Sequence, residues 1–155
     1  MKKVLFVCTG NTCRSPMAEA LFEKLINEKG LNDKFTYKSA GIYAFEHDPA
    51  TYEAIEVMKK EYGIDISSHR ASVLDYDDIM DSWLILVMTR HHRDMILDIY
   101  PQAADKVYTM KSFAEVDDGN PDISDPFGME YEVYKNCANE IERLLHKIID
   151  KLIKS

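Results

Sequence analysis

Two short, unbroken apolar runs constrain the fold of this chain most. They are VLFVC at residues 4–8 and LILVM at residues 84–88. Strands covered on both faces of a parallel sheet have such continuous apolar runs, whereas half-exposed strands alternate apolar and polar residues. Weaker strand candidates are TYKSAG at residues 36–41 and KVYTM at residues 106–110. The sequence therefore predicts a sheet of about four parallel strands.

Helical patterns lie between and after these runs. Apolar residues with helical spacing or helix-start signals mark three segments: from residue 17 to about Gly30, from Asp48-Pro49 to about Tyr62, and from Tyr134 to Leu152. Alternating strands and helices predict an α/β fold, formed as a single domain over residues 1–155 with helices on both faces of the sheet. Ligand sites in such folds lie where the strands lead into the helices.

The composition limits the classes of partner. The 155 residues are 46% apolar, which is enough for a hydrophobic core, and the formal net charge is −8. Because an acidic surface repels nucleic acid and anionic lipid, we expect neither as a partner, and any anion site must be built locally. The N-terminus has no apolar stretch long enough for a secretory signal or a membrane span. We expect a cytoplasmic protein with reduced thiols that is monomeric or associates only weakly.

The segment VCTGNTCRS at residues 7–15 combines a cysteine, an arginine and a serine at a strand-to-helix connection. Cys8 ends the first predicted strand, and Ser15-Pro16 suits the N-cap and first turn of the following helix. Loop amides and the helix N-terminus then converge on one point, which forms an oxyanion site and favours a thiolate at Cys8. Arg14 adds a planar fork that can hold two oxygens of a tetrahedral anion. These features predict a nucleophilic cysteine beside a phosphate-binding loop between the first strand and the first helix.

Other interpretations of this segment explain fewer residues. A metal site would need more ligands than Cys8 and Cys13, and the third cysteine, Cys137, lies on the apolar stripe of the last helix, where burial explains it. A structural disulfide is disfavoured in a reducing compartment. A nucleotide-binding P-loop is excluded because the motif G-x-x-x-x-G-K-[ST] is absent from the sequence. We therefore expect no metal and no cofactor.

The segment resembles the signature of the low-molecular-weight protein tyrosine phosphatase family. The match consists of Cys8, five intervening residues, Arg14, Ser15 and Pro16, together with a late motif at Asp125-Pro126-Phe127. The resemblance spans the whole chain and implies phosphorylated protein substrates and a metal-independent reaction in two steps. Cys8 would attack phosphorus to give a phosphocysteine, Arg14 and the loop amides would stabilise the oxygens, and Asp125 would protonate the leaving atom and then activate water.

The same resemblance implies further roles. Asn11, Ser15 and His69 would form the hydrogen-bond network that shapes the loop, with the Ser15 hydroxyl easing the departure of the Cys8 thiolate. Cys13 would be a redox guard that forms a reversible disulfide with Cys8, and its alternative is a small buried loop residue. Apart from the family, His69 is an ordinary structural histidine. Tyr43, which follows SAG, is either a residue of the pocket mouth or a surface aromatic. The candidate substrate-binding residues are Thr9, Gly10, Asn11, Thr12, Cys13, Arg14, Ser15, Phe127 and Tyr43.

Several aspartates compete for the role of general acid. Asp48-Pro49 precedes a helical pattern, so helix capping accounts for it. Asp125 lies in the irregular acidic stretch at residues 114–128, and a loop of this length in a small domain is usually functional or mobile. The aromatic residue two positions after Asp125 can form a pocket wall, which favours Asp125. The other aspartates of the stretch, Asp117, Asp118 and Asp122, are interpreted as solvated loop charge. Asp122 is the reserve candidate for the general acid.

Thr12 bears on the choice of substrate. Phosphotyrosine-selective relatives usually have an aliphatic residue at this position, whereas CTGNTCRSPMAE together with DPFG resembles the bacterial protein-arginine phosphatase branch. A hydroxyl can accept a hydrogen bond from a guanidinium N–H, so the sequence favours phosphoarginine over phosphotyrosine. Phe127-Gly128 also replaces the paired tyrosines of many animal members, so regulation through those tyrosines is not expected.

Two other functional classes remain as alternatives. Arsenate reductases that resemble this family need two further cysteines near the end of the third strand, where LVMTRHHRDMILD has none. A non-catalytic phosphate-binding module would be expected to lack Cys8, Arg14 or Asp125. In the same region, HHRD at residues 91–94 is interpreted as a solvated polar loop at the sheet edge.

Overall fold

The predicted parallel sheet is present in the computed structural model, which describes residues 1–154. Its strands lie side by side in the order β2-β1-β3-β4, and every neighbouring pair is parallel. The two continuous apolar runs form the inner strands, as expected for strands covered on both faces. The strand bounds are β1 Lys2–Cys8, β2 Phe35–Gly41, β3 Leu84–Val87 and β4 Val107–Thr109.

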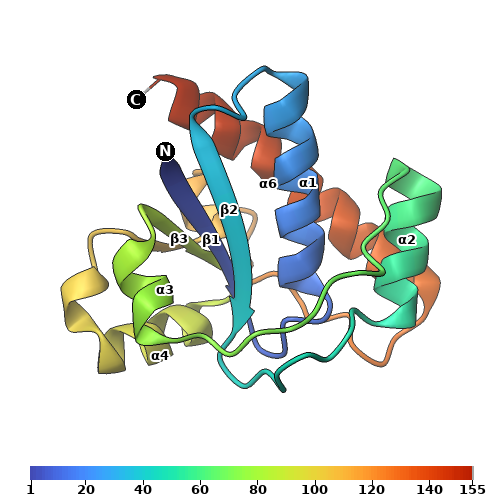
Figure 1. The fold of residues 1–155 in the computed structure, drawn as a ribbon, viewed down its shortest axis with the longest axis horizontal. Helices are drawn as coiled ribbons and strands as arrows, with labels where there is room; N and C mark the ends of the chain where they lie inside the picture. The colour runs from blue at the N-terminus through green and yellow to red at the C-terminus, as the bar shows by residue number, and fades with distance from the viewer. Residues whose placement is uncertain (155) are drawn as a thin grey trace.

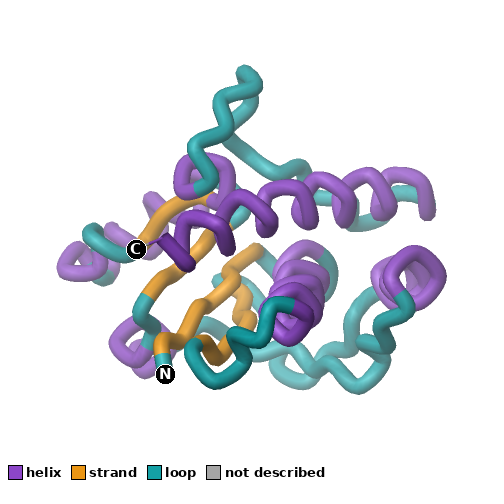
Figure 2. Tube along the Cα trace, turned by 90° about the horizontal axis from the view of Figure 1, so that it is seen from above, coloured by secondary structure: helices purple, strands orange, loops and turns teal. Residues whose placement is uncertain are grey.

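Helices cover both faces of this sheet, so the predicted α/β fold is confirmed. Helices α1 and α6 lie on one side and α3 and α4 on the other (Figure 1). The C-terminal helix α6 extends along the length of the molecule (Figure 2). The helix bounds are α1 Arg14–Glu28, α2 Tyr52–Tyr62, α3 Tyr76–Asp81, α4 Arg90–Ile99, α5 Met110–Phe113 and α6 Tyr131–Lys154, with a 3₁₀ turn at Pro101–Ala103. None of the helices within residues 1–154 combines the length and apolar character needed to cross a membrane.

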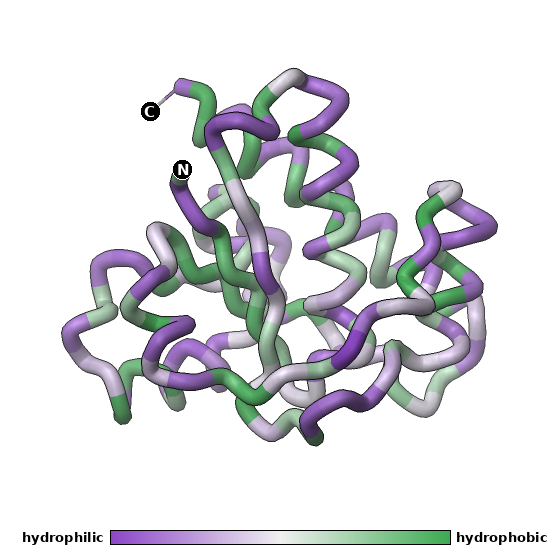
Figure 3. The backbone as a smooth tube through the Cα atoms, in the orientation of Figure 1, coloured by the Kyte–Doolittle hydropathy of each residue, from purple (hydrophilic) through white to green (hydrophobic). Residues whose placement is uncertain are grey.

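The side chains of β1 alternate between two buried clusters. Phe6 and Cys8 pack in the cluster that contains the apolar residues of α1 and α6. Leu5 and Val7 pack in the other cluster, which contains apolar residues of α3 and α4. Figure 3 shows hydrophilic residues on the outer loops and turns and hydrophobic residues along the interior strands. Full burial of one such side chain stabilises the fold by about 2 kcal/mol. The cluster on the α1 side therefore anchors the end of β1 where Cys8 lies.

The predicted capping role of Asp48 is wrong. Helix α2 begins at Tyr52, and its N-cap is Thr51, whose hydroxyl accepts a backbone N–H of the first turn. Residues 48–51 continue as a loop because Pro49 pairs with Arg70 in an isolated antiparallel bridge. Asp48 is therefore free of the helix and reaches the pocket described below.

The predicted cap of the first helix is also wrong. Helix α1 already begins at Arg14, and its N-cap residue, Cys13, makes no side-chain capping bond. Ser15 lies inside the first turn, where its hydroxyl contacts Cys8 instead of a backbone N–H.

The HHRD segment is not a solvated loop but the first turn of α4. Thr89 is the N-cap of this helix and accepts the backbone N–H of His92 at 3.2 Å. His91 is exposed, whereas His92 is only 3% exposed. The signals were present in the sequence, since Thr89 precedes Ile96 and Ile99 at helical spacing.

Candidate active site

The loop between β1 and α1 wraps around the sulfur atom of Cys8. The backbone N–H of Asn11 donates to Sγ at 3.3 Å, and the Ser15 hydroxyl lies 2.9 Å from the same atom. Cys8 and Ser15 are both buried. The sulfur atom is thus surrounded by hydrogen-bonding groups of the loop, as expected for a nucleophile that the loop holds in position.

Asn11 holds the loop in an unusual conformation. Its φ of 57° lies in the left-handed region, which asparagine tolerates better than most residues. Its side-chain amide donates to Ser15 Oγ at 2.8 Å and Ser39 Oγ at 3.0 Å, and accepts the backbone N–H of Ser72 at 3.0 Å. Its carbonyl oxygen lies 2.7 Å from His69 Nε2. Asn11 thus joins the loop to β2 and to the segment after α2, through Ser39 and Ser72, which the sequence analysis missed.

Gly41 at the end of β2 makes room for the same loop. A Cβ atom at this position would lie 2.6 Å from the carbonyl oxygen of Thr9 and 2.9 Å from the backbone nitrogen of Asn11. Both distances are closer than carbon can approach these backbone atoms. The glycine in SAG is therefore required by the close contact between the strand end and the loop.

Arg14 connects the loop to the long irregular segment before α6. Its side chain is almost wholly buried, with one guanidinium nitrogen donating to the carbonyl oxygen of Ile123 at 2.8 Å. The other terminal nitrogen lies 3.5 Å from Thr9 Oγ1 and 3.5 Å from the Asp125 carboxylate. A buried cation needs such partners, and an entering phosphoryl group would supply more.

Asp125 is the carboxylate of the irregular segment before α6 that lines the pocket. Its carboxylate accepts the backbone N–H of Phe127 at 3.1 Å, and the side chain remains 48% exposed. Asp122, the reserve candidate, instead accepts the backbone N–H of Arg90 at 2.9 Å and does not line the pocket. The two carboxylates thus have different surroundings, and only Asp125 adjoins Arg14.

Buried Lys111 fixes the irregular segment before α6 through ion pairs and a hydrogen bond. This lysine is 3% exposed and forms ion pairs with Asp118 at 3.2 Å and Glu140 at 3.1 Å. It also donates to the carbonyl oxygen of Asn120 at 2.7 Å. Asp118, interpreted from the sequence as solvated loop charge, is therefore a structural partner of a buried cation.

These groups surround a pocket of about 310 Å³. Its aromatic rim consists of Tyr43, Phe45 and Phe127, all exposed. Phe45 and Asp48 were missed by the sequence analysis; Phe45 lies in the same loop as Tyr43, which was the available signal. Asn11, Ser15 and His69 do not line the pocket but support its loop from behind. The full lining is Cys8, Thr9, Gly10, Thr12, Cys13, Arg14, Tyr43, Phe45, Asp48, Asp125 and Phe127.

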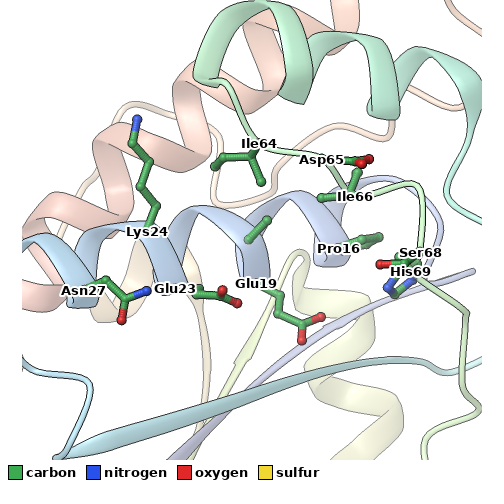
Figure 4. Close-up of a pocket in the computed structure, with 11 residues that line it drawn as sticks. Pro16, Glu19, Glu23, Lys24, Asn27, Ile64, Asp65, Ile66, Ser68 and His69 are labelled. Atoms are coloured by element: carbon green, nitrogen blue, oxygen red, sulfur yellow. The ribbon is translucent and has the colours of Figure 1, made fainter.

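A second pocket, of about 280 Å³, lies behind the loop along α1 (Figure 4). His69 lies at one end of it, and the carboxylates of Glu19 and Glu23 follow along the helix. Glu19 accepts a hydrogen bond from Ser39 at 2.6 Å, and burial raises the pKa of its carboxyl. No residue of the first pocket lines this one. Through Ser39, which also accepts from the Asn11 amide, Glu19 is linked to the loop.

His92, in the first turn of α4, contacts the loop from the side of the sheet opposite to α1. Its Nε2 lies 2.9 Å from the Thr9 hydroxyl. Burial, followed by the nearby charge of Arg14, lowers the pKa of His92 to about 4. The imidazole is therefore neutral at physiological pH. The sequence analysis missed this residue because it assigned the segment to a loop.

The two remaining cysteines are buried thiols. Cys13 Sγ lies 3.3 Å from the Tyr134 hydroxyl, and burial raises the pKa of its thiol. Cys137 donates weakly to the carbonyl oxygen of Ser124 at 3.9 Å, and burial raises its pKa to about 12. Within residues 1–154, no group of three histidine, cysteine or acidic side chains is arranged to hold a metal ion.

A comparison with known protein families assigns the chain to one of them. The model of the low molecular weight phosphotyrosine protein phosphatase family matches residues 3–155. The chain belongs to this family of protein phosphatases. A curated relative of the phosphatase is the protein-arginine-phosphatase of Geobacillus stearothermophilus, which is 45% identical over 150 residues, or 97% of this chain and 95% of the relative.

Solved structures agree with the family assignment. A low molecular weight protein tyrosine phosphatase from T. tengcongensis matches the phosphatase with a TM-score of 0.91 and 47% identity, covering 97% of this chain and 99% of the other. A mutant of the arginine phosphatase YwlE matches with a TM-score of 0.91 and 37% identity, covering 99% and 97%. That mutant carries a phosphorylated active-site serine. The named relatives thus include both arginine and tyrosine phosphatases.

Proposed function

We propose that this phosphatase hydrolyses phosphorylated protein side chains through a phosphocysteine on Cys8 and prefers phosphoarginine to phosphotyrosine. One observation carries the reaction type: a single pocket brings together the Cys8 thiol, the Arg14 guanidinium and the Asp125 carboxylate. Cys8 is a nucleophile, Arg14 can bind an anion through two N–H groups, and Asp125 can donate and accept a proton. Because Arg14 and the loop amides supply the positive potential, the reaction needs no metal ion.

The first step transfers the phosphoryl group to sulfur. The Cys8 thiolate forms an S–P bond while the bond from phosphorus to the substrate nitrogen or oxygen breaks. The leaving atom takes the electron pair of that bond and a proton from the Asp125 carboxyl. Arg14 exchanges its contact with Asp125 for the phosphoryl oxygens, and the loop amides bind the charge that develops on them.

The second step releases inorganic phosphate. A water molecule gives a proton to the Asp125 carboxylate and forms an O–P bond, and the S–P bond breaks with its electrons returning to Cys8. The departing thiolate receives hydrogen bonds from the Ser15 hydroxyl and the Asn11 N–H, which lie 2.9 Å and 3.3 Å from sulfur. The enzyme returns to its starting state.

Polar groups in the pocket support phosphoarginine as the substrate. Thr12 lines the pocket with a hydroxyl that can accept a guanidinium N–H, and the carboxylate of Asp48 favours a cationic side chain. The arginine-phosphatase relative at 45% identity supports the same preference. Phosphotyrosine is the second candidate because the three exposed aromatic residues of the rim could pack against its ring. A cytoplasmic location is proposed with this function, because reducing conditions keep the nucleophilic thiol free.

Phosphoarginine and phosphotyrosine peptides of the same sequence test the preference. We expect wild-type kcat/KM to be higher for phosphoarginine. Thr12→Ile removes the hydroxyl but keeps a branched side chain, and should lower the phosphoarginine to phosphotyrosine ratio about tenfold or more. Thr12→Ser keeps the hydroxyl and is the matched control. A ratio that is the same in wild type and Thr12→Ile would refute the substrate assignment but leave the phosphocysteine reaction intact.

A further inference from the structure

The Thr9 hydroxyl lies between a histidine and the phosphate-binding arginine. Thr9 Oγ1 is 2.9 Å from His92 Nε2 and 3.5 Å from a terminal guanidinium nitrogen of Arg14. Thr9 and Arg14 line the catalytic pocket, whereas His92 does not. The histidine therefore reaches the pocket only through the threonine.

Arg14 fixes one hydrogen-bond direction in this chain, and the tautomer of His92 sets the other. Arg14 has donors and no acceptor, so Thr9 Oγ1 must accept from it. When the neutral imidazole carries its proton on Nδ1, the single proton of the Thr9 hydroxyl donates to His92 Nε2. Nδ1 is buried and has no hydrogen-bond partner within residues 1–154. The ring is thus held in place by packing and by the Thr9 contact alone, at the cost of one unsatisfied polar atom.

A hydroxyl without this acceptor would lose its fixed orientation. It could rotate so that its proton points toward Arg14, where it would repel the guanidinium instead of accepting from it. Arg14 would then keep only the Ile123 carbonyl at 2.8 Å and the carboxylate of Asp125 at 3.5 Å. Because Asp125 must exchange this contact for proton transfer, the Thr9 contact is the one on this side that can persist through the reaction.

We propose that His92 is a positioning residue that fixes the Thr9 hydroxyl as an acceptor and so orients Arg14 for the phosphoryl group. The proposal rests on the function assigned to Arg14 above. It adds a role for the first turn of α4, which makes no contact with the substrate pocket itself. It also gives a reason for a histidine with an unsatisfied ring nitrogen in the interior, where an apolar residue would fit without that cost.

Substitutions at His92 test the role with p-nitrophenyl phosphate as substrate and inorganic phosphate as inhibitor. His92→Leu removes the acceptor and should lower kcat/KM and weaken phosphate inhibition, each about tenfold. His92→Gln can place an amide oxygen near the position of Nε2 and should restore most of both. His91→Leu makes the same change at the exposed neighbour and should behave as wild type. Wild-type phosphate inhibition in His92→Leu would overturn the proposal.

A double-mutant cycle keeps the test informative if His92→Leu does not fold. Thr9→Val removes the hydroxyl from a surface loop with little change in shape, and Thr9→Ser keeps it as a control. His92→Ala removes the imidazole with a smaller change than leucine and should weaken phosphate inhibition about tenfold when Thr9 is intact, but have no further effect in the Thr9→Val background, because the path to Arg14 is already broken. Independent, additive effects of the two substitutions would overturn the proposal. If wild type shows no phosphatase activity at all, the function of the site fails, and not merely the role of His92.

Discussion

The Sγ atom of Cys8 and the Oγ atom of Ser15 lie 2.9 Å apart in a buried contact. Asn11 donates its side-chain N–H to the same hydroxyl at 2.8 Å, so the Ser15 proton is directed toward sulfur. A hydrogen bond to a charged group contributes about 1.5–3 kcal/mol. The contact is therefore strong enough to affect the departure of the thiolate from the phosphocysteine.

Ser15→Ala should slow the second step more than the first. With the hydroxyl removed, the thiolate loses a donor that is needed when the S–P bond breaks, and kcat should fall by about tenfold to a hundredfold. The phosphocysteine should accumulate, so p-nitrophenol release under stopped flow should show a burst equal to the enzyme concentration. A reduced kcat without a burst would place the effect on the first step and contradict this role.

Asp125→Asn should harm substrates in proportion to the basicity of the leaving group. Nitrophenolate leaves without full protonation, whereas an arginine nitrogen or a tyrosine oxygen depends on the acid. We expect a loss of about a hundredfold or more for phosphopeptides and a smaller loss for p-nitrophenyl phosphate. Asp122→Asn changes the reserve candidate, which accepts the backbone N–H of Arg90 instead, and serves as the control. Equal losses for all substrates would argue for a different acid.

Cys13→Ser should make oxidative inactivation irreversible. Burial raises the pKa of the Cys13 thiol, so it stays protonated, and Cys8 is the first target of peroxide. The neighbouring thiol can then capture the oxidised Cys8 as a disulfide that dithiothreitol reverses. Wild type should recover activity after peroxide and dithiothreitol, and Cys13→Ser should not. Cys137→Ser, a change at a buried thiol outside the pocket, should recover like wild type.

The buried imidazole of His92 should make the protein less stable in mild acid. Its pKa is near 6.5 in the unfolded chain and about 4 in the folded protein, so between these values the unfolded state binds more protons. The free energy of unfolding therefore falls as the pH drops from about 6.5 to about 4, with a contribution of about 2 kcal/mol between about pH 7 and about pH 5.

Urea unfolding of wild type and His92→Gln at these two pH values measures this contribution. The variant lacks the titrating group and should lose about 2 kcal/mol less than wild type on acidification. Equal losses in the two proteins would show that His92 does not keep a depressed pKa in the folded state.

Much of the fold could be predicted because the strands of this sheet are covered on both faces. The runs at residues 4–8 and 84–88 form the two inner strands, and the apolar stripe of the last segment is buried in α6. Helix starts were less predictable. Aspartate is a common N-cap residue, but the bridge between Pro49 and Arg70 keeps the chain in a loop from Asp48 to Thr51.

Most candidate site residues could be located because the loop after β1 is a local motif. Residues from other parts of the chain could not. Phe45 and Asp48 reach the pocket only through the path of the β2–α2 loop. His92 contacts Thr9 only because α4 follows the strand next to β1. The partner of Arg14 at Ile123 is a backbone carbonyl, which leaves no signal in residue type. Tertiary contacts, not local pattern, set these positions.

Turnover of p-nitrophenyl phosphate by Cys8→Ser tests the central claim most directly. The variant keeps Arg14 and the loop amides, so inorganic phosphate should still bind, as measured by calorimetry. Its turnover should fall by more than about a thousandfold, because the alcohol is a much poorer nucleophile than the thiolate. Loss of turnover with phosphate binding retained is the predicted result. Turnover near that of wild type would contradict a phosphocysteine mechanism.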